Sequence, residues 1–370
     1  MTIADRKNAH VDLAVDQQRR AVGSNDFDDV RFIHHALAGI DCADVDLTTS
    51  IAGIALRAPF FINAMTGGSD RTGQINRELA IAAAATGIPI ATGSMSAYLR
   101  DESIADSFRV VRQKNPDGVV MANVNANVTV DQARRAIDLV AANVLQIHLN
   151  AVQEIVMGEG DRCFSHWPER IAQIAASADV PVMVKEVGFG LSRNTVLRLR
   201  DCGVAIADVG GRGGTNFARI ENDRHLDPLV DYSFIEHWGQ STAASLLDNA
   251  GVTGIDVTAT GGIRSPLDVA RCLALGATAC GVAGRFLKIL LDRGVDDLVA
   301  TINHWCEQLA RIMAVLGAST PESLAHRDLL ITGELLQFCR ARGIEVTAYA
   351  RRSTQETAAD STPAEGKSPA

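Results

Sequence analysis

Four polar side chains that could do chemistry lie within seven residues of one another: His148, Asn150, Gln153 and Glu154. They follow a short apolar run, and such a composition is poorly suited to packing a core. A single carboxylate such as Glu154, completed by water and by the phosphate oxygens of a substrate, matches the usual way in which proteins bind Mg²⁺, whereas zinc requires more nitrogen or sulfur ligands. The alternative is a helix start whose polar residues only face solvent.

Lys185 is a second candidate, because it ends the apolar run Pro181-Val-Met-Val. A lysine in such a place forms a Schiff base, neutralises an anionic ligand, or pairs with a neighbouring carboxylate as a structural ion. The chain shows no signature of an aldolase or of a pyridoxal-phosphate enzyme, and amide and hydroxyl residues are close in sequence. These features favour stabilisation of an anion.

Two glycine-containing segments, Gly261-Gly262 and Ala283-Gly284, predict a phosphate site. Each follows an apolar run, and Ser265-Pro266 starts a helix directly after the first segment. Backbone N–H groups and the positive end of a helix dipole favour an anion at such a place. The alternative, that the glycines only make tight turns, is weaker for two segments than for one.

Three possible cations, Arg6, Lys7 and His10, lie within five residues near the N-terminus. On composition alone, such a group is most often a solvated charge cluster.

The elements that must position these residues follow one rhythm. A short apolar or β-branched run, a Gly- or Asn-containing turn and a helical pattern repeat eight times, with runs at 59–63, 88–92, 119–123, 144–148, 180–185, 204–209, 255–260 and 277–282. Helix starts are marked at Thr129-Val-Asp-Gln132 and Ser265-Pro-Leu-Asp268, each with an oxygen cap and a polar residue three positions later. The pattern predicts an α/β fold, a single closed (β/α)8 TIM barrel, with an open doubly wound sheet as the alternative. In such a barrel the working residues follow the strands.

The predicted boundaries are an N-terminal extension at 1–58, the barrel at 59–291, a C-terminal helical segment at 292–348 and a disordered tail at 349–370. The tail is expected to be disordered because it is rich in Ser, Thr, Ala, Pro and Glu, with almost no large apolar residue. The segment from 210 to 239 is longer than an ordinary connection, and part of it is expected to close over substrate as a lid.

Composition excludes several classes of protein. The chain has 370 residues and a net charge of −9, which argues against nonspecific binding to nucleic acid or to an anionic membrane. At 47% hydrophobic and 21% charged residues, the chain as a whole is not disordered. Seven cysteines without a Cys-x-x-Cys pair, and an N-terminus without an apolar signal core, predict reduced, buried thiols and a soluble, cytoplasmic protein.

The residues together resemble a known family, the type 2 isopentenyl-diphosphate delta-isomerases. The similarity runs from residue 6 to about residue 345. It is carried by Arg6-Lys-Asn-Ala-His10, Phe61-Ile-Asn-Ala-Met-Thr-Gly-Gly68, Leu145-Gln-Ile-His-Leu-Asn-x-x-Gln-Glu154, Val184-Lys-Glu-Val-Gly-Phe-Gly190, Gly213-Gly-Thr-Asn-Phe217 and Trp238-Gly-x-Ser-Thr242. Two departures are Met95, where many members have glutamine, and Asn8-Ala9, where an acidic residue is common.

This resemblance implies conversion of isopentenyl diphosphate to dimethylallyl diphosphate by an allylic proton shift, with reduced FMN, Mg²⁺ and NADPH as reductant. The flavin would be contacted by Ala64, Met65, Thr66, Ser94, Asn123, Lys185 and Thr215, and its phosphate by Gly261, Gly262, Arg264, Ala283 and Gly284. Substrate would be bound by Arg6, Lys7, His10, Arg100, His148, Asn150 and Gln153, with Glu154 on the metal. Gln153 and Lys185 would be the catalytic residues, with Lys185 near the N1/C2-carbonyl edge of the ring. A homo-oligomer, a tetramer or larger, is also implied.

Three alternatives are open to test. An FMN-dependent 2-hydroxy-acid oxidase or dehydrogenase needs a His base, and no His lies in the loop directly after the seventh run. An IMP-dehydrogenase-like barrel needs a cysteine after the sixth run, and none stands between Cys202 and Cys272. A flavin-binding scaffold without turnover would not need Lys185, Gln153 and Glu154.

Overall fold

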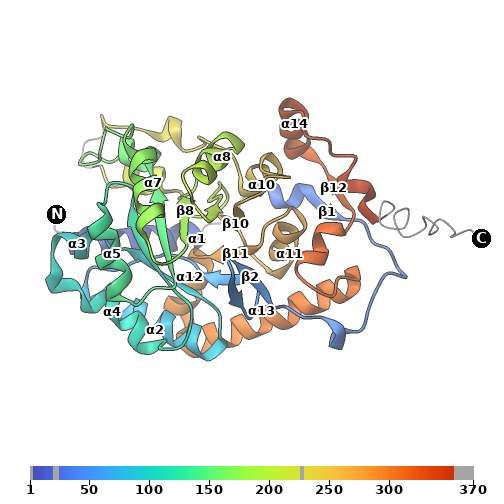
Figure 1. Ribbon diagram of the computed structural model, residues 1–370, viewed down its shortest axis with the longest axis horizontal. Coiled ribbons are helices and arrows are strands. Elements are labelled where there is room, and N and C mark those ends of the chain that lie inside the picture. Colours follow the sequence, from blue (N-terminus) through green and yellow to red (C-terminus); the bar gives the residue numbers. More distant parts are fainter. Residues whose placement is uncertain (1–2, 20–24, 226–228, 354–370) are drawn as a thin grey trace, which may run out of the picture.

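A closed barrel of eight parallel strands forms the centre of the molecule (Figure 1). The computed structural model describes residues 3–19, 25–225 and 229–353. The strands follow the order β10-β11-β4-β5-β6-β7-β8-β9 around the barrel. Their bounds are β4 Phe60–Ile62, β5 Ile90–Ser94, β6 Val120–Asn125, β7 Val144–Leu149, β8 Val182–Glu186, β9 Ile206–Asp208, β10 Asp256–Thr260 and β11 Ala279–Val282. Each overlaps one of the eight predicted runs, so the predicted TIM barrel is confirmed and the open sheet is excluded.

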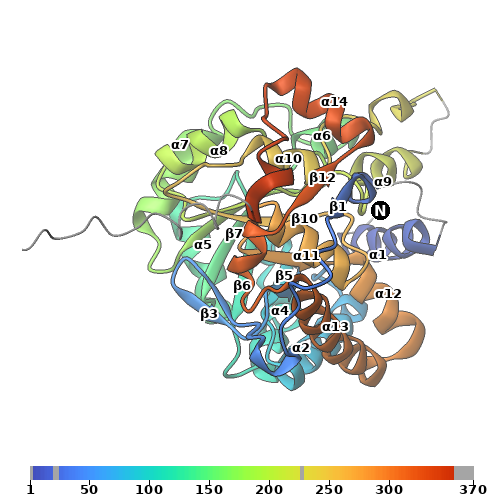
Figure 2. The same ribbon diagram turned by 90° about the vertical axis from the view of Figure 1, so that its right-hand side faces the viewer.

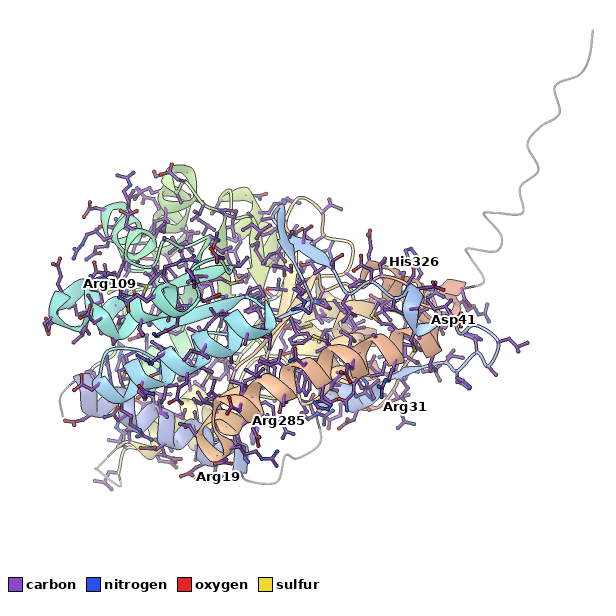
Figure 3. All side chains as sticks on the ribbon, turned by 90° about the horizontal axis from the view of Figure 1, so that it is seen from below. Arg19, Arg31, Asp41, Arg109, Arg285 and His326 are labelled. Carbon is purple, nitrogen blue, oxygen red and sulfur yellow. The ribbon has the colours of Figure 1, made fainter. Side chains whose placement is uncertain are left out.

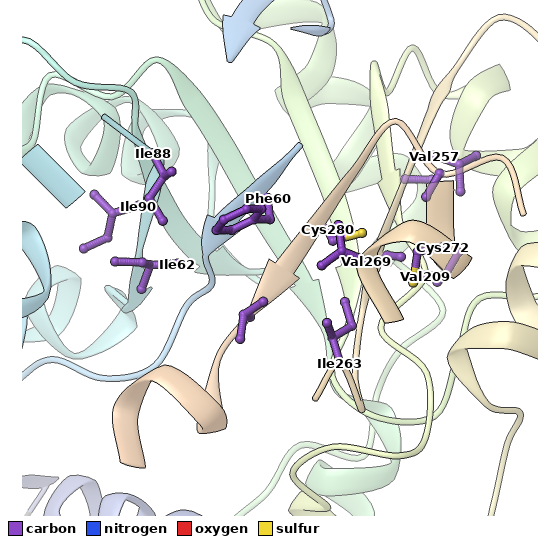
Figure 4. Packing of buried hydrophobic residues seen from close by; sticks show 14 of the residues in the cluster. Phe60, Ile62, Ile88, Ile90, Val209, Val257, Ile263, Val269, Cys272 and Cys280 are labelled. Atoms are coloured by element: carbon purple, nitrogen blue, oxygen red, sulfur yellow. The ribbon is translucent and has the colours of Figure 1, made fainter. Parts of the chain in front are cut away.

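Helices surround this barrel. The main ones are α2 Asp70–Thr86, α4 Asp106–Lys114, α5 Val130–Leu139, α7 Trp167–Ser177, α8 Arg193–Asp201, α10 Thr242–Asp248, α11 Pro266–Ala274 and α12 Gly284–Arg293. Their apolar faces pack on outward-facing strand residues; Figure 4 shows Phe60, Ile62 and Ile90 of the strands with Val269 and Cys272 of α11. All seven cysteines are free, as predicted, but the expectation that they are buried is wrong for Cys42 and Cys163, which are exposed. Of the helices that the structure describes, none has the length and apolar character needed to cross a bilayer.

The two predicted helix caps have different outcomes. Thr129 caps α5 in a reciprocal capping box with Gln132, as expected. Ser265 is the N-cap of α11, but its side chain makes no capping hydrogen bond. Asp268 accepts a hydrogen bond from the backbone N–H of Arg264 and also pairs with the guanidinium group of Arg264. The predicted helix start at Ser265 is therefore confirmed, but the side-chain cap expected there is not formed.

A short hairpin closes the end of the barrel at which the strands begin. Strands β2 Thr49–Ile51 and β3 Ile54–Leu56 pair antiparallel. Ile51 and Leu56 join an apolar cluster inside the barrel that includes Phe61, Met121 and Met183. This cluster fills the end of the barrel at which the strands begin. The polar interior residues lie toward the opposite end, where the carboxyl ends of the strands meet.

The N- and C-terminal segments pack on the barrel and on each other. Strand β1 Val30–Phe32 pairs antiparallel with β12 Leu329–Ile331 (Figure 2). Helix α13 Val295–Leu316 lies along α2, as Figure 3 shows from below, and α14 Gly333–Arg342 packs on α10. The region predicted as a tail from residue 349 begins with an ordered turn, η6 Tyr349–Arg351, in which Tyr349 is buried beneath the guanidinium group of Arg352. The rest of that prediction, residues 354–370, lies outside the described residues.

Candidate active site

A cavity of about 830 Å³ opens at the carboxyl ends of the barrel strands. Ligand pockets usually have volumes of about 300–1,000 Å³. Every site residue predicted from the sequence lines this cavity. The structure therefore brings all of these residues together, and the contacts below show what holds each group in place.

A glycine-rich cradle forms one end of the cavity. A side chain at Gly262, which has φ +76°, would place its Cβ 2.6 Å from Asn25 Nδ2, and one at Gly214 would place it 2.9 Å from the backbone nitrogen of Gly262. Asn25 Nδ2 donates to the carbonyl oxygen of Gly262 at 2.8 Å, which holds the loop closed. Helix α12 begins at Gly284 beside this cradle, and the N–H groups of its first turn have no partner within the helix. The cradle fits a phosphate group and leaves no space for side chains.

Arg264 lies beside this cradle with its guanidinium group already paired. It donates to both carboxylate oxygens of Asp28, at 2.6 and 3.0 Å, and to Asp268. The hydrogen bonds that Arg264 donates to Asp28 and to Asp268 raise its pKa, and Arg264 in turn holds the pKa of Asp28 at about 2. Arg264 therefore ties the N-terminal segment to the cradle, and its contact with a phosphate stays a prediction.

Lys185 is buried at the bottom of the cavity, among acidic groups. Its Nζ donates to the backbone carbonyl oxygen of Glu186 at 2.7 Å. The Glu186 carboxylate accepts hydrogen bonds from the backbone N–H groups of residues 187, 188 and 189, yet burial raises its pKa to about 7. Asp208, the register partner of Lys185 on β9, is fully buried. Lys185 is thus the cation of a buried, mainly acidic layer.

A chain of amides fixes the tautomer of His148. Asn123 Nδ2 donates to Gln146 Oε1 at 3.0 Å, so Asn123 Oδ1 accepts a hydrogen bond from His148 Nδ1 at 2.8 Å. Burial, with the charges of Lys185 and Lys7, lowers the pKa of His148 to about 3. The neutral ring then carries its proton on Nδ1, which leaves Nε2 as an acceptor.

Glu154 lies on the short helix α6 Ala151–Val156 and is buried. One oxygen accepts from Asn150 Nδ2 at 2.7 Å, and the other accepts from the backbone N–H of Asp161 at 2.8 Å. Within the described ranges, no group of three or more His, Cys, Asp or Glu side chains could hold a metal ion. A cation here would bind one protein carboxylate and take its other ligands from elsewhere.

Glu221 is a buried residue that sequence reasoning missed and that contacts two predicted site residues, Gln153 and His10. It lies on α9 Phe217–Asp223 and is 1% exposed. Gln153 Nε2 donates to Glu221 Oε1 at 2.6 Å, His10 Nε2 lies 3.0 Å from the same oxygen, and Arg224 pairs with the other. Burial would raise the pKa of Glu221, but these partners outweigh it and hold the pKa at about 2. Asn216 was the local sequence feature that indicated the helix carrying Glu221, because its side chain caps α9 and fixes where this helix begins.

The N-terminal cations lie on α1 Ile3–Arg19, which crosses the mouth of the cavity beside α9 and α12 (Figure 2). Burial, with the nearby charges of Arg6 and Arg100, lowers the pKa of Lys7 to about 8, although Glu221 acts in the opposite direction. Arg100 ends the short helix α3 Ser96–Arg100 and also lines the cavity. The charge cluster is therefore part of the site, and the solvated alternative is excluded.

The two departures from the family pattern lie away from the ligand space. Met95 is fully buried and belongs to the outer core. Asn8 Oδ1 accepts a hydrogen bond from Ser69 Oγ at 2.9 Å, which joins α1 to the start of α2. Neither residue lines the cavity, so both are structural contacts here.

Comparison with known proteins gives consistent findings. A family model described as FMN-dependent dehydrogenase matches residues 122–331. The chain is 65% identical over 350 residues to an isopentenyl-diphosphate delta-isomerase of Nocardia farcinica, which covers 95% of this chain and 96% of that protein. It is 60% identical over 354 residues to the protein of the same name from Kitasatospora griseola, with 96% of each chain covered.

Solved structures share the fold at low sequence identity. A mandelate oxidase matches with a TM-score of 0.60 and 18% identity, over 89% of this chain and 100% of that one. A lactate oxidase of Pediococcus acidilactici matches with a TM-score of 0.62 and 18% identity, over 89% of this chain and 94% of that one. These likenesses support the barrel architecture alone.

Proposed function

This chain belongs to the isopentenyl-diphosphate delta-isomerase family, and from that premise we propose that it converts isopentenyl diphosphate into dimethylallyl diphosphate. The observation that carries the proposal is one cavity with two kinds of anion site. A glycine cradle and Lys185 line it, and so do the cations of α1 with Gln153 and Glu154. We infer that the first group anchors a cofactor and the second a diphosphate substrate.

The residues present fit FMN. Gly214 and Gly262 allow two loops to approach too closely for a Cβ, both glycines line the cavity, and the start of α12 favours a phosphate. We infer that Gly261, Gly262, Ala283 and Gly284 hold the phosphate, while Ala64, Met65, Thr66, Ser94, Asn123 and Thr215 contact the rest of the cofactor. Lys185 would stabilise negative charge on the ring. When bound and reduced, FMN supplies acid–base chemistry toward an alkene that ordinary side chains lack.

The substrate diphosphate would be bound by residues of three elements. Arg6, Lys7 and His10 come from α1, Arg100 from α3, and His148 and Asn150 from the end of β7. Because neutral His148 offers Nε2 as an acceptor, it must take up a proton before it can donate to a phosphate oxygen. We propose that Mg²⁺ binds one oxygen of Glu154 together with substrate phosphates and water, as this ion commonly does.

Gln153 would act next to the reacting carbons. Its amide nitrogen is committed to Glu221 at 2.6 Å, so Glu221 fixes the direction of the side chain. The remaining oxygen, Oε1, lies 3.4 Å from Asn150 Nδ2. Diphosphate binding in a site held this rigidly supplies remote binding energy, which orients the hydrocarbon part of the substrate.

The deciding experiment is anaerobic incubation with isopentenyl diphosphate, Mg²⁺, FMN and NADPH, followed by detection of dimethylallyl diphosphate. Product should form only after the flavin is reduced, and Lys185→Ala should lose the activity. Omission of Mg²⁺ tests the metal separately. If the wild-type protein binds FMN but forms no product, the alternative of a flavin-binding scaffold stands.

A 2-hydroxy-acid oxidase is not favoured, although the solved structures with the same fold include such enzymes. The loop after β10 contains Gly261, Gly262 and Ile263, and the histidines that line the cavity are His10, His148 and His237. The loop between β10 and α11 therefore holds no histidine to serve as the base of hydroxy-acid oxidation. The cytoplasmic location and the homo-oligomeric assembly expected from the sequence remain parts of the proposal.

A further inference from the structure

We propose that Asp208 is the counterion of Lys185, a positioning residue that sets how strongly the Lys185 ammonium stabilises reduced over oxidised FMN. The inference rests on the proposed function, because it concerns the cofactor of that site. Asp208 does not line the cavity, whereas Lys185 does. It would therefore act through the lysine and not by contact with the cofactor.

Strand register places the two residues opposite each other on adjacent strands. Lys185 on β8 pairs with Asp208 on β9, and Asp208 pairs in turn with Thr258 on β10. Register partners on adjacent strands point to the same face of a sheet. Because Lys185 points into the barrel, Asp208 and Thr258 do so as well, above the apolar cluster that contains Met183 and Ile206.

One carboxylate oxygen of Asp208 is available to an ammonium group. Oδ1 accepts from the Thr260 hydroxyl at 2.8 Å and from the backbone N–H of Gly210 at 3.3 Å. Oδ2 is buried, and in the part of the chain that the structure describes it has no hydrogen-bond partner. A buried carboxylate oxygen without a partner is costly unless a charge compensates it.

Lys185 is the nearby charge that can do so. Its ammonium has three donors, and Glu186 accepts one through its backbone carbonyl. One oxygen of the Glu186 carboxylate is held by three backbone N–H groups of its own turn, and the Lys185 charge lowers the pKa of this group as well, so Glu186 is a second negative charge near the ammonium. Burial raises the pKa of Asp208 to about 6, and the Lys185 ammonium is the strongest influence that lowers it.

The expected consequence is a change in the net charge next to the flavin ring of bound FMN. With the carboxylate present, part of the lysine charge is compensated before any cofactor binds. Without it, the full ammonium charge would act on the cofactor, and the electron-rich reduced form would gain more than the neutral oxidised form. Asp208 would thus hold the reduction potential of the bound flavin down.

The test compares FMN-loaded wild type with Asp208→Asn. The two-electron midpoint potential of bound FMN is measured by anaerobic dye equilibration at one fixed pH. The dissociation constant of oxidised FMN is measured alongside it by fluorescence. We expect reduced FMN to be favoured about tenfold more in the variant, which is a rise of about 30 mV for a two-electron couple. An unchanged or lowered potential would overturn the proposal.

Thr258→Val is the matched control. It alters the register partner of Asp208, a fully buried side chain in the same layer, without changing charge. Its potential should equal that of the wild type. An equal shift in this variant would show that packing, and not the carboxylate charge, moves the potential.

A second measurement covers the case in which Asp208→Asn folds poorly. Adding Lys185→Met removes the buried ammonium that lost its counterion, so the double variant should unfold at a higher temperature than Asp208→Asn alone. Failure of this rescue would also overturn the pairing. If wild type does not bind FMN, the proposed function fails before any variant is compared, so the two failures are distinguishable.

Discussion

Gln153 is held by a carboxylate that no sequence motif indicated. Glu221 accepts the amide of Gln153 at 2.6 Å, and Arg224 compensates its charge. Glu221→Gln would replace a charged acceptor with an amide that can donate to Gln153 instead. We expect kcat to fall about 10²-fold with KM little changed, because orientation near the reacting carbons is lost while the diphosphate anchor is kept. Steady-state kinetics on the reduced enzyme measure this.

The control for this prediction is Glu159→Gln. Glu159 pairs with Arg224 and with Arg6 and is half exposed, so it shares Arg224 with Glu221 without contacting Gln153. Near wild-type kcat is expected for it. A loss of kcat in both variants would mean that Arg224, and not the Gln153 contact, is what Glu221 secures.

Lys7 should give the enzyme an alkaline limit. Its pKa is lowered to about 8 by burial and by Arg6 and Arg100, so the side chain is an ammonium below this pH and a neutral amine above it. Attraction of the diphosphate requires the ammonium. We therefore expect kcat/KM to fall above pH 8, by up to about tenfold per pH unit. Lys7→Arg, which stays charged, should lose this decline, and a decline at the same pH in that variant would assign it to another group.

At the scale of elements, the loop after α6 holds the Glu154 carboxylate in place. Arg162 donates hydrogen bonds to the carbonyl oxygens of Glu154, Met157 and Gly160 at 2.5–2.8 Å. In this loop conformation the backbone N–H of Asp161 donates to the Glu154 carboxylate. Arg162→Met should release the loop. We expect the Mg²⁺ concentration for half-maximal activity to rise about tenfold, as is common when the support of a metal ligand is removed. Arg134→Met, at an exposed position on α5, is the matched control and should leave the Mg²⁺ requirement unchanged.

Helix α1 and the segment after β9 should close together. Gln17 Nε2 donates to the carbonyl oxygen of Asn216 at 3.1 Å, and the Asn216 N–H donates back to Gln17 Oε1 at 2.8 Å. We expect isopentenyl diphosphate to slow hydrogen exchange in both α1 and residues 211–238, because each borders the cavity. Gln17→Ala should weaken the protection of α1 and leave α5 unaffected. Exchange that substrate does not change across 211–238 would refute the predicted lid.

The site residues that the sequence predicts well are those that follow the barrel strands. Residues that follow apolar runs of a parallel barrel must meet at one face, so His148, Lys185 and the glycine pair at 261 were placed by periodicity and topology alone. Glu221, Arg162 and Asp208 were not, because their roles depend on partners in other elements. A buried Asp at the end of an apolar strand carries no local sign that a lysine one strand away faces it.

At the scale of the whole molecule, the predicted extensions are parts of one body. Strand β1 pairs with β12 almost 300 residues later, and Asp29 accepts the hydroxyl of Thr332 at the start of α14. Three-residue strands with a distant partner leave no periodic signal, so this sheet could not be predicted from composition or spacing. It joins the N-terminal segment, which reaches the phosphate cradle through Asn25, to the C-terminal helices.

Buried carboxyl groups should make the stability of the whole protein fall toward alkaline pH. Burial raises the pKa of Glu186 to about 7 and that of Asp208 to about 6. Because the folded state binds these protons more tightly, their contribution is complete below about pH 4 and is lost as pH rises through about 6 to 7. Glu221 and Asp28, with pKa values lowered to about 2, act in the opposite sense and lose their contribution only in acid.

Glu186→Gln tests this balance, because a glutamine oxygen still accepts the backbone N–H groups of its turn but never ionises. The variant should gain ~2–3 kcal/mol relative to wild type between pH 5 and pH 8, as the wild-type carboxyl group is forced to ionise in a buried place. Thermal midpoints of both proteins at the two pH values, with FMN saturating throughout, give the measurement. Glu322→Gln, at an exposed carboxylate, should track wild type at both values. An advantage of Glu186→Gln at pH 5 that equals its advantage at pH 8 would show that packing, and not ionisation, separates the two proteins.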